Sequence, residues 1–156
     1  MTMDALDILL EQAQAERNGA LAAFNQSRAR CDAARAQATQ LDAYRADYHQ
    51  RWSAQFAQGA GLDIVRCYQS FADRLETAIA QQAQAVALAQ AAQARAGDAL
   101  SAAELCVASV RKLIERRAAA QRQALERREQ KADDEQAMRV ALARGGLSNH
   151  KTGVRP

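Results

Sequence analysis

The chain has 156 residues, of which 49% are hydrophobic, 25% are charged and only 4% are aromatic. Alanine makes up the largest part of the hydrophobic fraction and buries little area per residue, so the composition excludes an ordinary globule packed around large side chains. The 21 basic and 18 acidic residues nearly balance, and the net charge of +3 indicates no particular class of partner.

The start of the chain does not resemble a signal peptide, because Asp4 and Asp7 stand where basic residues are expected. No apolar run approaches the about 18 residues that a transmembrane helix needs. Three cysteines without CxxC or Cys–His spacing are interpreted as reduced thiols: Cys31, Cys67 and Cys106. The sequence therefore predicts a cytoplasmic protein that holds no metal or cofactor and reaches a membrane only by docking to a partner.

The first predicted element is one long helix over about residues 4–57, with Gly19 as its only glycine and no proline. Two rows of mostly apolar residues repeat every seven positions and are offset by four, which predicts a coiled-coil seam. The first row is Leu6, Ala13, Ala20, Ser27, Ala34, Leu41 and Tyr48. The second row is Leu10, Arg17, Phe24, Cys31, Ala38, Arg45 and Trp52. Near Tyr44 the apolar position is expected to shift by one residue.

A turn is predicted at residues 58–62, where Gly59 and Gly61 concentrate helix breakers. Asp63 suits the start of a second helix, expected over about residues 63–143 and roughly 120 Å long at about 1.5 Å per residue. Its predicted seam contains Phe71, Leu75, Ala78, Gln82, Ala85, Ala89, Leu100, Ala103, Val107, Val110 and Ile114. The polar residues 147–156 are predicted to form a disordered tail.

A short connection makes two long amphipathic helices antiparallel neighbours, because neither can bury its apolar stripe alone. The predicted fold is therefore all-α: a two-helix antiparallel coiled-coil hairpin over residues 1–146, with a longer second helix. The register that follows places Tyr48 near Phe71 and Leu6 near Ile114. Residues after about Ile114 then have no partner within the chain.

Six of the seven aromatic residues fall within 28 positions around the predicted turn: Tyr44, Tyr48, Trp52, Phe56, Tyr68 and Phe71. One interpretation is that these bulky rings close the end of a thin coiled coil. The other is that some of them stay exposed as a binding surface, because a two-stranded coil has too few seam positions to bury all six.

A basic stretch lies toward the end of the second helix, where eight basic residues face three acidic ones and give a net charge of about +5. The basic residues are Arg111, Lys112, Arg116, Arg117, Arg122, Arg127, Arg128 and Lys131. This stretch is interpreted either as a solvated helix of mixed charge or as a surface that another protein completes. Nucleic acid is a weaker alternative, because the charge is sparse and no aromatic residue is interleaved with it.

No arrangement of residues points to catalysis. The sequence has no glycine-rich phosphate loop and no GxSxG motif, and a coiled coil offers no concave cavity that shields a reaction from water. His49 and His150 each lack a second ligand at helical spacing. The chain is therefore not expected to be an enzyme.

Several short motifs are more specific than the general coiled-coil pattern. An LxxYxxxY pattern at residues 41–48 precedes the glycine turn, and an FxxxLxxAI pattern follows at residues 71–79. A third set of matching segments lies toward the end of the predicted second helix, at residues 129–131, 133–135 and 138–139. In kind and order, the chain from roughly residue 4 to 143 resembles the flagellar FliJ family.

This resemblance implies a soluble, stalk-like component of the flagellar type III protein export apparatus, located in the cytoplasm at the inner membrane. It implies association with the hexameric export ATPase FliI, the export gate protein FlhA and export chaperones, and no role for nucleic acid. The equivalent stalk of a virulence-type secretion injectisome shares this architecture and is the nearest alternative.

The resemblance also assigns residues to partners. The positions that match the family's gate-binding surface are Gln37, Leu41, Tyr44, Tyr48, Phe71, Leu75, Ala78 and Gln82. Gln82 departs from the family, whose members can hold histidine there. By analogy with the shafts of rotary ATPases, the residues expected to contact the ATPase ring are Arg111, Lys112, Arg116, Arg117 and Arg122.

Overall fold

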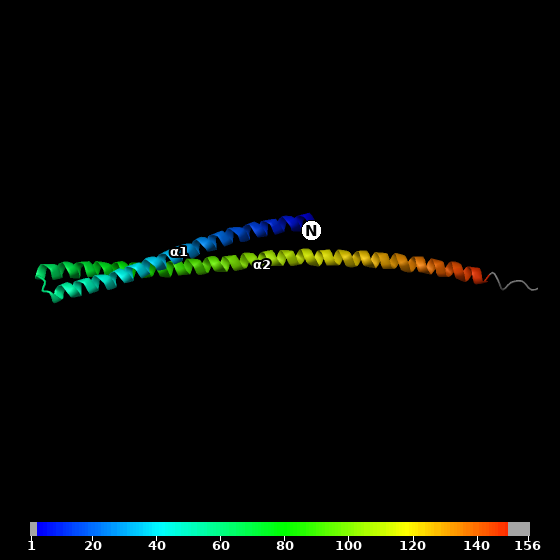
Figure 1. The fold of residues 1–156 in the computed structure, drawn as a ribbon. Helices are drawn as coiled ribbons and strands as arrows, with labels where there is room; N and C mark the ends of the chain where they lie inside the picture. Colours follow the sequence, from blue (N-terminus) through cyan, green and yellow to red (C-terminus); the bar gives the residue numbers. More distant parts are fainter. Residues whose placement is uncertain (1–2, 150–156) are drawn as a thin grey trace, which may run out of the picture.

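The computed structural model describes residues 3–149, and these form two α-helices and no strand. Helix α1 spans Met3–Ala57, 55 residues, and helix α2 spans Leu62–Asn149, 88 residues. The two helices are joined at the turn and lie side by side from there to the N-terminus of α1. Beyond that point α2 continues alone (Figure 1). The prediction of an all-α antiparallel hairpin with a longer second helix is confirmed.

The turn between the helices contains two glycines, of which Gly59 has a backbone conformation that favours glycine. Gly59 adopts a φ of +89°, the left-handed region that favours glycine, and its amide donates to the carbonyl oxygen of Phe56 at 3.1 Å. The carbonyl oxygen of Gly61 accepts the amides of Ile64 at 3.1 Å and Val65 at 3.2 Å, which starts α2. Asp63 lies in the first turn of α2, where its negative charge interacts favourably with the positive end of the helix dipole.

The seam of α1 follows the predicted heptad rows. All fourteen residues of the two rows are buried or half-buried, and most residues between the rows are exposed. The predicted shift near Tyr44 is wrong, because Tyr44 is 50% exposed and Arg45 remains in the seam. The long side chain of Arg45 tolerates this position because its guanidinium group reaches Glu76 of α2.

The seam of α2 differs from the prediction at two places. Phe71 is 37% exposed while Ala72 beside it is half-buried, and Ala85 is exposed while Val86 is half-buried. The phase of the seven-residue repeat is set by the whole row of seam residues down to Val107 and Val110, not by the largest local side chain. Those two predicted seam positions are therefore each wrong by one residue.

The open end of the hairpin is held by aliphatic side chains. Ala13 of α1 and Val107 and Val110 of α2 are buried against each other, and Leu9, Leu10 and Ile114 pack around them. The first turns of α1 therefore lie level with Ile114, as the predicted register requires.

Helix α2 extends further than predicted. It runs through Gly145 and Gly146 to Asn149, so the expected end near residue 143 is wrong, and residues 147–149 of the predicted disordered tail are helical. Gly59 is the only glycine with positive φ among the described residues, so neither later glycine forms the left-handed cap that ends many helices. Residues 150–156, including His150, lie outside the described residues.

From Ala120 to Gly146 every residue of α2 is exposed, and we call this segment the exposed arm. Within residues 3–149, neither helix contains an apolar stretch that could span a lipid bilayer. Among residues 3–149 no group of three or more histidine, cysteine, aspartate or glutamate side chains is arranged to hold a metal ion.

Candidate docking surface

The six aromatic side chains near the turn form one continuous group, which we call the ring cluster. Tyr48 is its centre, with ring centroids 4.6 Å from Phe71 and 5.4 Å from Tyr68. Tyr44 extends the cluster away from the turn, 6.3 Å from both Tyr48 and Phe71. Trp52 and Phe56 extend it toward the turn, 5.5 Å and 5.2 Å from Tyr68. Both helices thus contribute rings to the same level of the hairpin.

A shallow hollow of about 370 Å³ adjoins the ring cluster, and we call it the amide hollow. It is lined by Gln37, Gln40, Leu41 and Tyr44 of α1 and Gln82 of α2. Tyr44 belongs to both features and joins the ring cluster and the amide hollow into one surface, which we call the docking surface. The lining combines the side chains of Leu41 and Tyr44 with three glutamine amides, which suits contact with an apolar side chain and hydrogen bonds to the polar groups around it.

The structure brings together most of the residues that the sequence assigned to gate binding. Gln37, Leu41, Tyr44 and Gln82 line the amide hollow, and Tyr48 and Phe71 belong to the ring cluster. Leu75 is only 7% exposed, so its side chain supports this surface from beneath. Ala78 lines a different shallow hollow, formed by α2 alone with Asp73, Arg74, Thr77 and Gln81.

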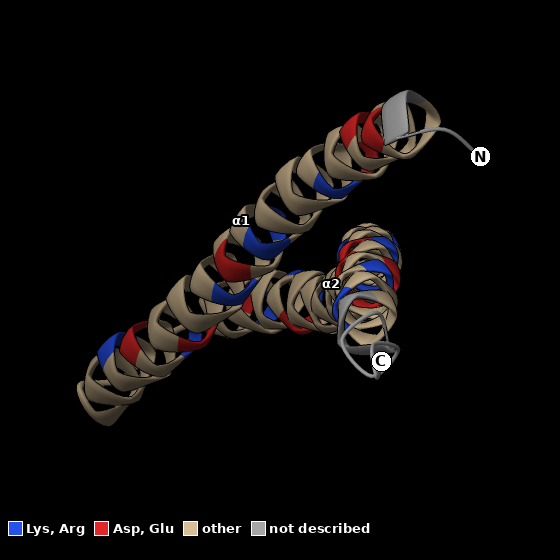
Figure 2. Cartoon of the chain, turned by 90° about the vertical axis from the view of Figure 1, so that its right-hand side faces the viewer, with Lys and Arg blue, Asp and Glu red and all other residues tan. Residues whose placement is uncertain are grey.

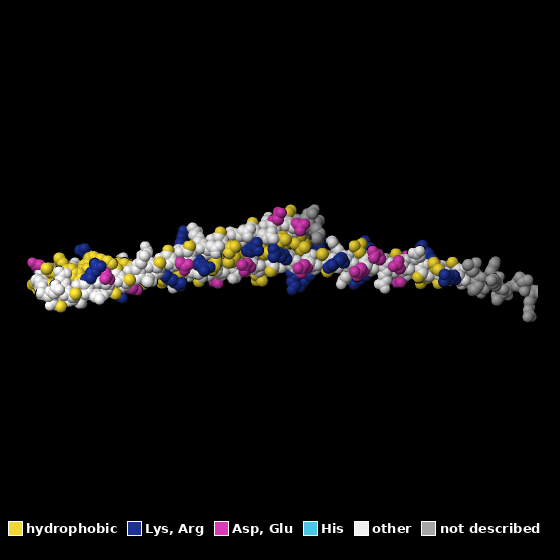
Figure 3. Space-filling model, viewed as in Figure 1, with side chains coloured by type: hydrophobic (Ala, Val, Ile, Leu, Met, Phe, Trp, Pro, Cys, Tyr) yellow, Lys and Arg dark blue, Asp and Glu magenta, His cyan; other side chains and the backbone are white. Residues whose placement is uncertain are grey.

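The exposure of the six rings agrees in part with each interpretation made from the sequence, that the rings close the coiled coil and that some of them form an exposed surface. Tyr44 and Phe71 are exposed, at 50% and 37%, whereas Tyr48, Trp52, Phe56 and Tyr68 are half-buried. The inner rings therefore close the end of the coiled coil, and the outer two present aromatic surface to solvent. Figure 3 shows hydrophobic side chains gathered at this end of the molecule.

Three polar links between the helices escaped the analysis of the sequence. Arg45 pairs with Glu76, Nη1 lying 3.2 Å from Oε2. The ring nitrogen Nδ1 of His49 is hydrogen-bonded to the hydroxyl of Tyr68. The Nε2 of Gln82 donates to the carbonyl oxygen of Ala34 at 2.9 Å. The only available signal was the hairpin register, which places each pair at nearly the same level.

The environment of Tyr48 changes its acidity. Loss of water around the hydroxyl raises its pKa above the ordinary 10.0, and a hydrogen bond with Trp52 opposes this effect. Neighbouring Tyr68, Tyr44 and Cys67 raise the pKa further when they carry negative charge. The hydroxyl of Tyr48 therefore keeps its proton to a higher pH than an ordinary tyrosine does.

The five basic residues assigned to an ATPase ring do not all lie on the exposed arm. Arg111 and Lys112 follow Val110, which is buried against α1, so they lie where the two helices are still paired. Arg116 and Arg117 lie where the pairing ends, and only Arg122 is on the exposed arm. Figure 2 shows basic and acidic residues interleaved along both helices. Of the eight residues of the basic stretch, Arg111 and Lys112 therefore lie beside the paired helices, and the other six follow Ile114.

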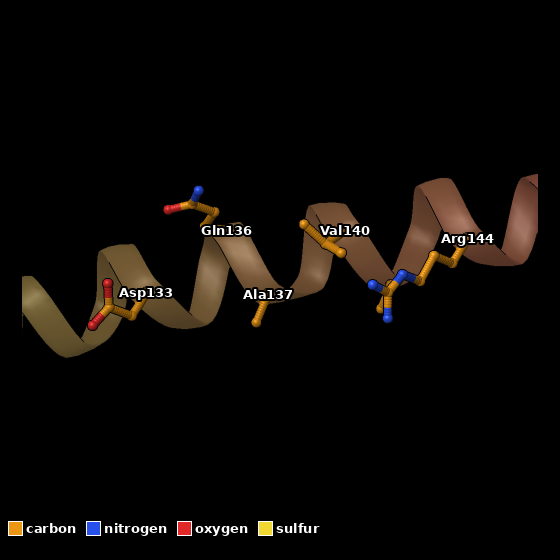
Figure 4. Close-up of a pocket in the computed structure, with 6 residues that line it drawn as sticks. Asp133, Gln136, Ala137, Val140 and Arg144 are labelled. Carbon is orange, nitrogen blue, oxygen red and sulfur yellow. The ribbon is translucent and has the colours of Figure 1, made fainter.

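A shallow depression on the exposed arm offers no enclosed site. It is lined by Asp133, Gln136, Ala137, Val140, Ala141 and Arg144, all from α2. Figure 4 shows the labelled side chains spread along one helix with no opposing wall. This depression therefore lacks the shielding from water that a catalytic pocket needs.

One of three comparisons with known proteins identifies a family for this chain. A search of curated proteins and a search of solved structures gave no match. The family model described as flagellar FliJ protein matches residues 3–146, which includes the paired helices, the turn and the exposed arm. The chain belongs to the FliJ family of flagellar type III export components.

Proposed function

We propose that this chain couples the export ATPase FliI to the export gate protein FlhA at the cytoplasmic side of the inner membrane, and that it assists export chaperones. The observation that carries the proposal is the continuous surface formed by the amide hollow and the outer rings Tyr44 and Phe71. This surface lies near the turn, and the exposed arm lies at the opposite extremity (Figure 1). The two ends are thus suited to different partners.

In this proposal the chain has no catalytic group of its own and acts by changing the populations of its partners. Binding the assembled ATPase ring more tightly than free subunits favours assembly, since a ligand shifts an equilibrium by its difference in affinity for the two states. Binding FlhA through the docking surface at the same time holds the ring close to the gate. The rod thereby raises the local concentration of one partner near the other.

The test of gate binding uses Tyr44→Ala. Half of the Tyr44 side chain is exposed, so truncation removes contact area without opening the seam. We expect at least a roughly tenfold loss of affinity for purified FlhA cytoplasmic domain in calorimetry, as for an aromatic anchor at the centre of an interface. Circular dichroism should show unchanged helicity.

Leu88→Ala is the matched control, because Leu88 is a 72% exposed apolar residue of α2 outside the docking surface. It should bind FlhA as the parent chain does. Unchanged affinity of Tyr44→Ala, or equal losses in both variants, would contradict the proposed surface. Tyr48→Ala is less informative, because Tyr48 contacts four other rings and its removal disturbs the end of the hairpin itself.

A further inference from the structure

Much of the hairpin seam consists of small side chains that select its alignment poorly. On the side of the docking surface away from the turn, the α1 seam includes Ser27, Cys31, Ala34 and Ala38. Sliding one helix along the other by seven residues keeps every seam position in the seam, because the pattern repeats every seven residues. Small side chains pack almost equally well in such shifted alignments. The turn and the ring cluster favour one alignment at this extremity, and a seam residue that pairs in only one alignment adds to their effect.

Arg45 has the properties of such a residue. It occupies a seam position between Leu41 and Tyr48, both part of the docking surface, and its side chain is only 36% exposed. Its Nη1 lies 3.3 Å from Oε1 and 3.2 Å from Oε2 of Glu76 on the opposite helix. The Glu76 side chain is 54% exposed, so this carboxylate stabilises the Arg45 guanidinium group modestly, as partly exposed ion pairs do.

The sequence on either side of Glu76 makes this contact specific for one alignment. Shifting α2 by seven residues in one direction brings Ala83 to the position of Glu76, and shifting it in the other direction brings Gln69. Neither side chain carries a negative charge. Asp42, 3.5 Å from Arg45, is on the same helix and moves with it, so it stabilises all alignments alike.

We propose that Arg45, through its pair with Glu76, is a positioning residue that acts with the turn and the ring cluster to select the axial alignment of α1 against α2 beneath the docking surface. A polar seam residue of this kind selects an alignment at some cost in stability, since an apolar residue packs better in the seam. Arg45 thereby determines which residues of the two helices face the same partner. The inference concerns the hairpin itself and does not depend on which partner binds.

Arg17 supplies a matched control. It is the other arginine in the α1 seam and is also half-buried, but its guanidinium group contacts Asn18 on the same helix at 3.2 Å. Replacing either arginine by leucine removes a seam charge and adds an apolar side chain. Only Arg45→Leu removes the pair with Glu76.

The experiment measures the distance between spin labels on cysteines placed at the exposed positions Ala22 and Ala80 of the full chain. The native cysteines are replaced in all variants by Cys31→Ala, Cys67→Ser and Cys106→Ser. In the hairpin register the labels are separated along the axis by about 18 residues, or roughly 27 Å at about 1.5 Å per residue. A shift of one helix by seven residues changes this separation by about 10 Å.

We expect one distance in the reference chain and in Arg17→Leu. Arg45→Leu should add a second distance that differs by about 10 Å along the axis, while its thermal midpoint is unchanged or higher because leucine fills the seam. Arg45→Glu should disturb the alignment in the same way, and combining it with Glu76→Arg should restore the single distance. Such a rescue is expected only if an ion pair between positions 45 and 76 determines the alignment.

A single distance in Arg45→Leu would overturn the proposal, whatever its thermal midpoint. A second distance in the reference chain or in Arg17→Leu would also overturn it, because the alignment would then not depend on Arg45. The proposal would also fail if the double variant Arg45→Glu with Glu76→Arg still showed two distances. The alignment would then not depend on the ion pair.

Discussion

Single residues at the turn and in the ring cluster determine how the end of the hairpin is built. Gly59 is required because its φ of +89° is costly for residues with a Cβ atom, whereas Gly61 starts α2 without such a requirement. Tyr48 has the most ring contacts within the cluster and joins the two helices through Phe71 and Tyr68. Each of these features leads to a measurable effect of substitution.

Gly59→Ala should destabilise the hairpin by about 1–2 kcal/mol, because the left-handed conformation is strained for alanine although no atom lies within 4 Å of the added Cβ. Thermal unfolding followed by circular dichroism measures the change. Gly61→Ser is the control and should be neutral or slightly stabilising, since serine is preferred at the start of a helix. Equal stability of Gly59→Ala and the parent chain would show that the turn relaxes to another conformation.

The raised pKa of Tyr48 makes the stability of the hairpin sensitive to alkali. Its pKa is raised above 10.0 in the folded chain, so above pH about 10 the folded state retains a proton that the unfolded state loses. Stability is therefore complete below that pH and falls as the pH rises. Tyr48→Phe should lose less thermal stability than the parent chain between pH 9 and about 11. An identical decline in both chains would assign the effect to other groups.

At the scale of the helices, the long amphipathic pattern made the elements predictable. The heptad rows from Leu6 to Trp52 identified the α1 seam because each row repeats over many turns and a local exception such as Arg17 does not change its phase. Phe71 was assigned to the seam because a large ring usually marks the core, yet the repeat places Ala72 there. The end of α2 was missed because glycine permits helical and left-handed conformations alike.

The candidate site was less predictable than the fold. Its position near the turn followed from the register, but the link between His49 and Tyr68 and that between Gln82 and Ala34 depend on side-chain rotamers that no sequence pattern specifies. The burial of Leu75 beneath the surface likewise depends on the exact phase of the α2 seam.

Gly97→Ala should stabilise α2. A Cβ atom at this position would lie 3.5 Å and 3.8 Å from ring atoms of Phe24, which is ordinary van der Waals contact. Alanine also favours the helix over glycine by up to about 1 kcal/mol, so the thermal midpoint should rise by a few degrees. Gly19→Ala, with no atom within 4 Å of its Cβ, measures the helix preference alone. A lower midpoint for Gly97→Ala would mean that the Phe24 ring needs the space.

At the scale of the whole molecule, two ends of different character are held apart by a thin paired stem. Figure 3 shows hydrophobic side chains collected near the turn and charged side chains of both signs along the single-helix portion. This separation supports the proposed coupling role, because one partner can occupy each end without competing for the same residues.

Stimulation of FliI should depend on the exposed arm in this proposal. Adding the purified chain to FliI should raise its rate of ATP hydrolysis, and Arg122→Glu should reduce this stimulation several-fold by reversing a charge on the arm. Arg30→Glu, an equivalent change at an exposed site of α1, should leave stimulation intact. Equal stimulation by all three chains would place the ATPase contact elsewhere.

The ring cluster contains Trp52, the single tryptophan of the chain. The indole emission of the unmodified protein therefore originates entirely from the extremity near the turn. Occupancy of that extremity by a partner without tryptophan is open to direct optical titration, with no dye attached and no background from the rest of the rod.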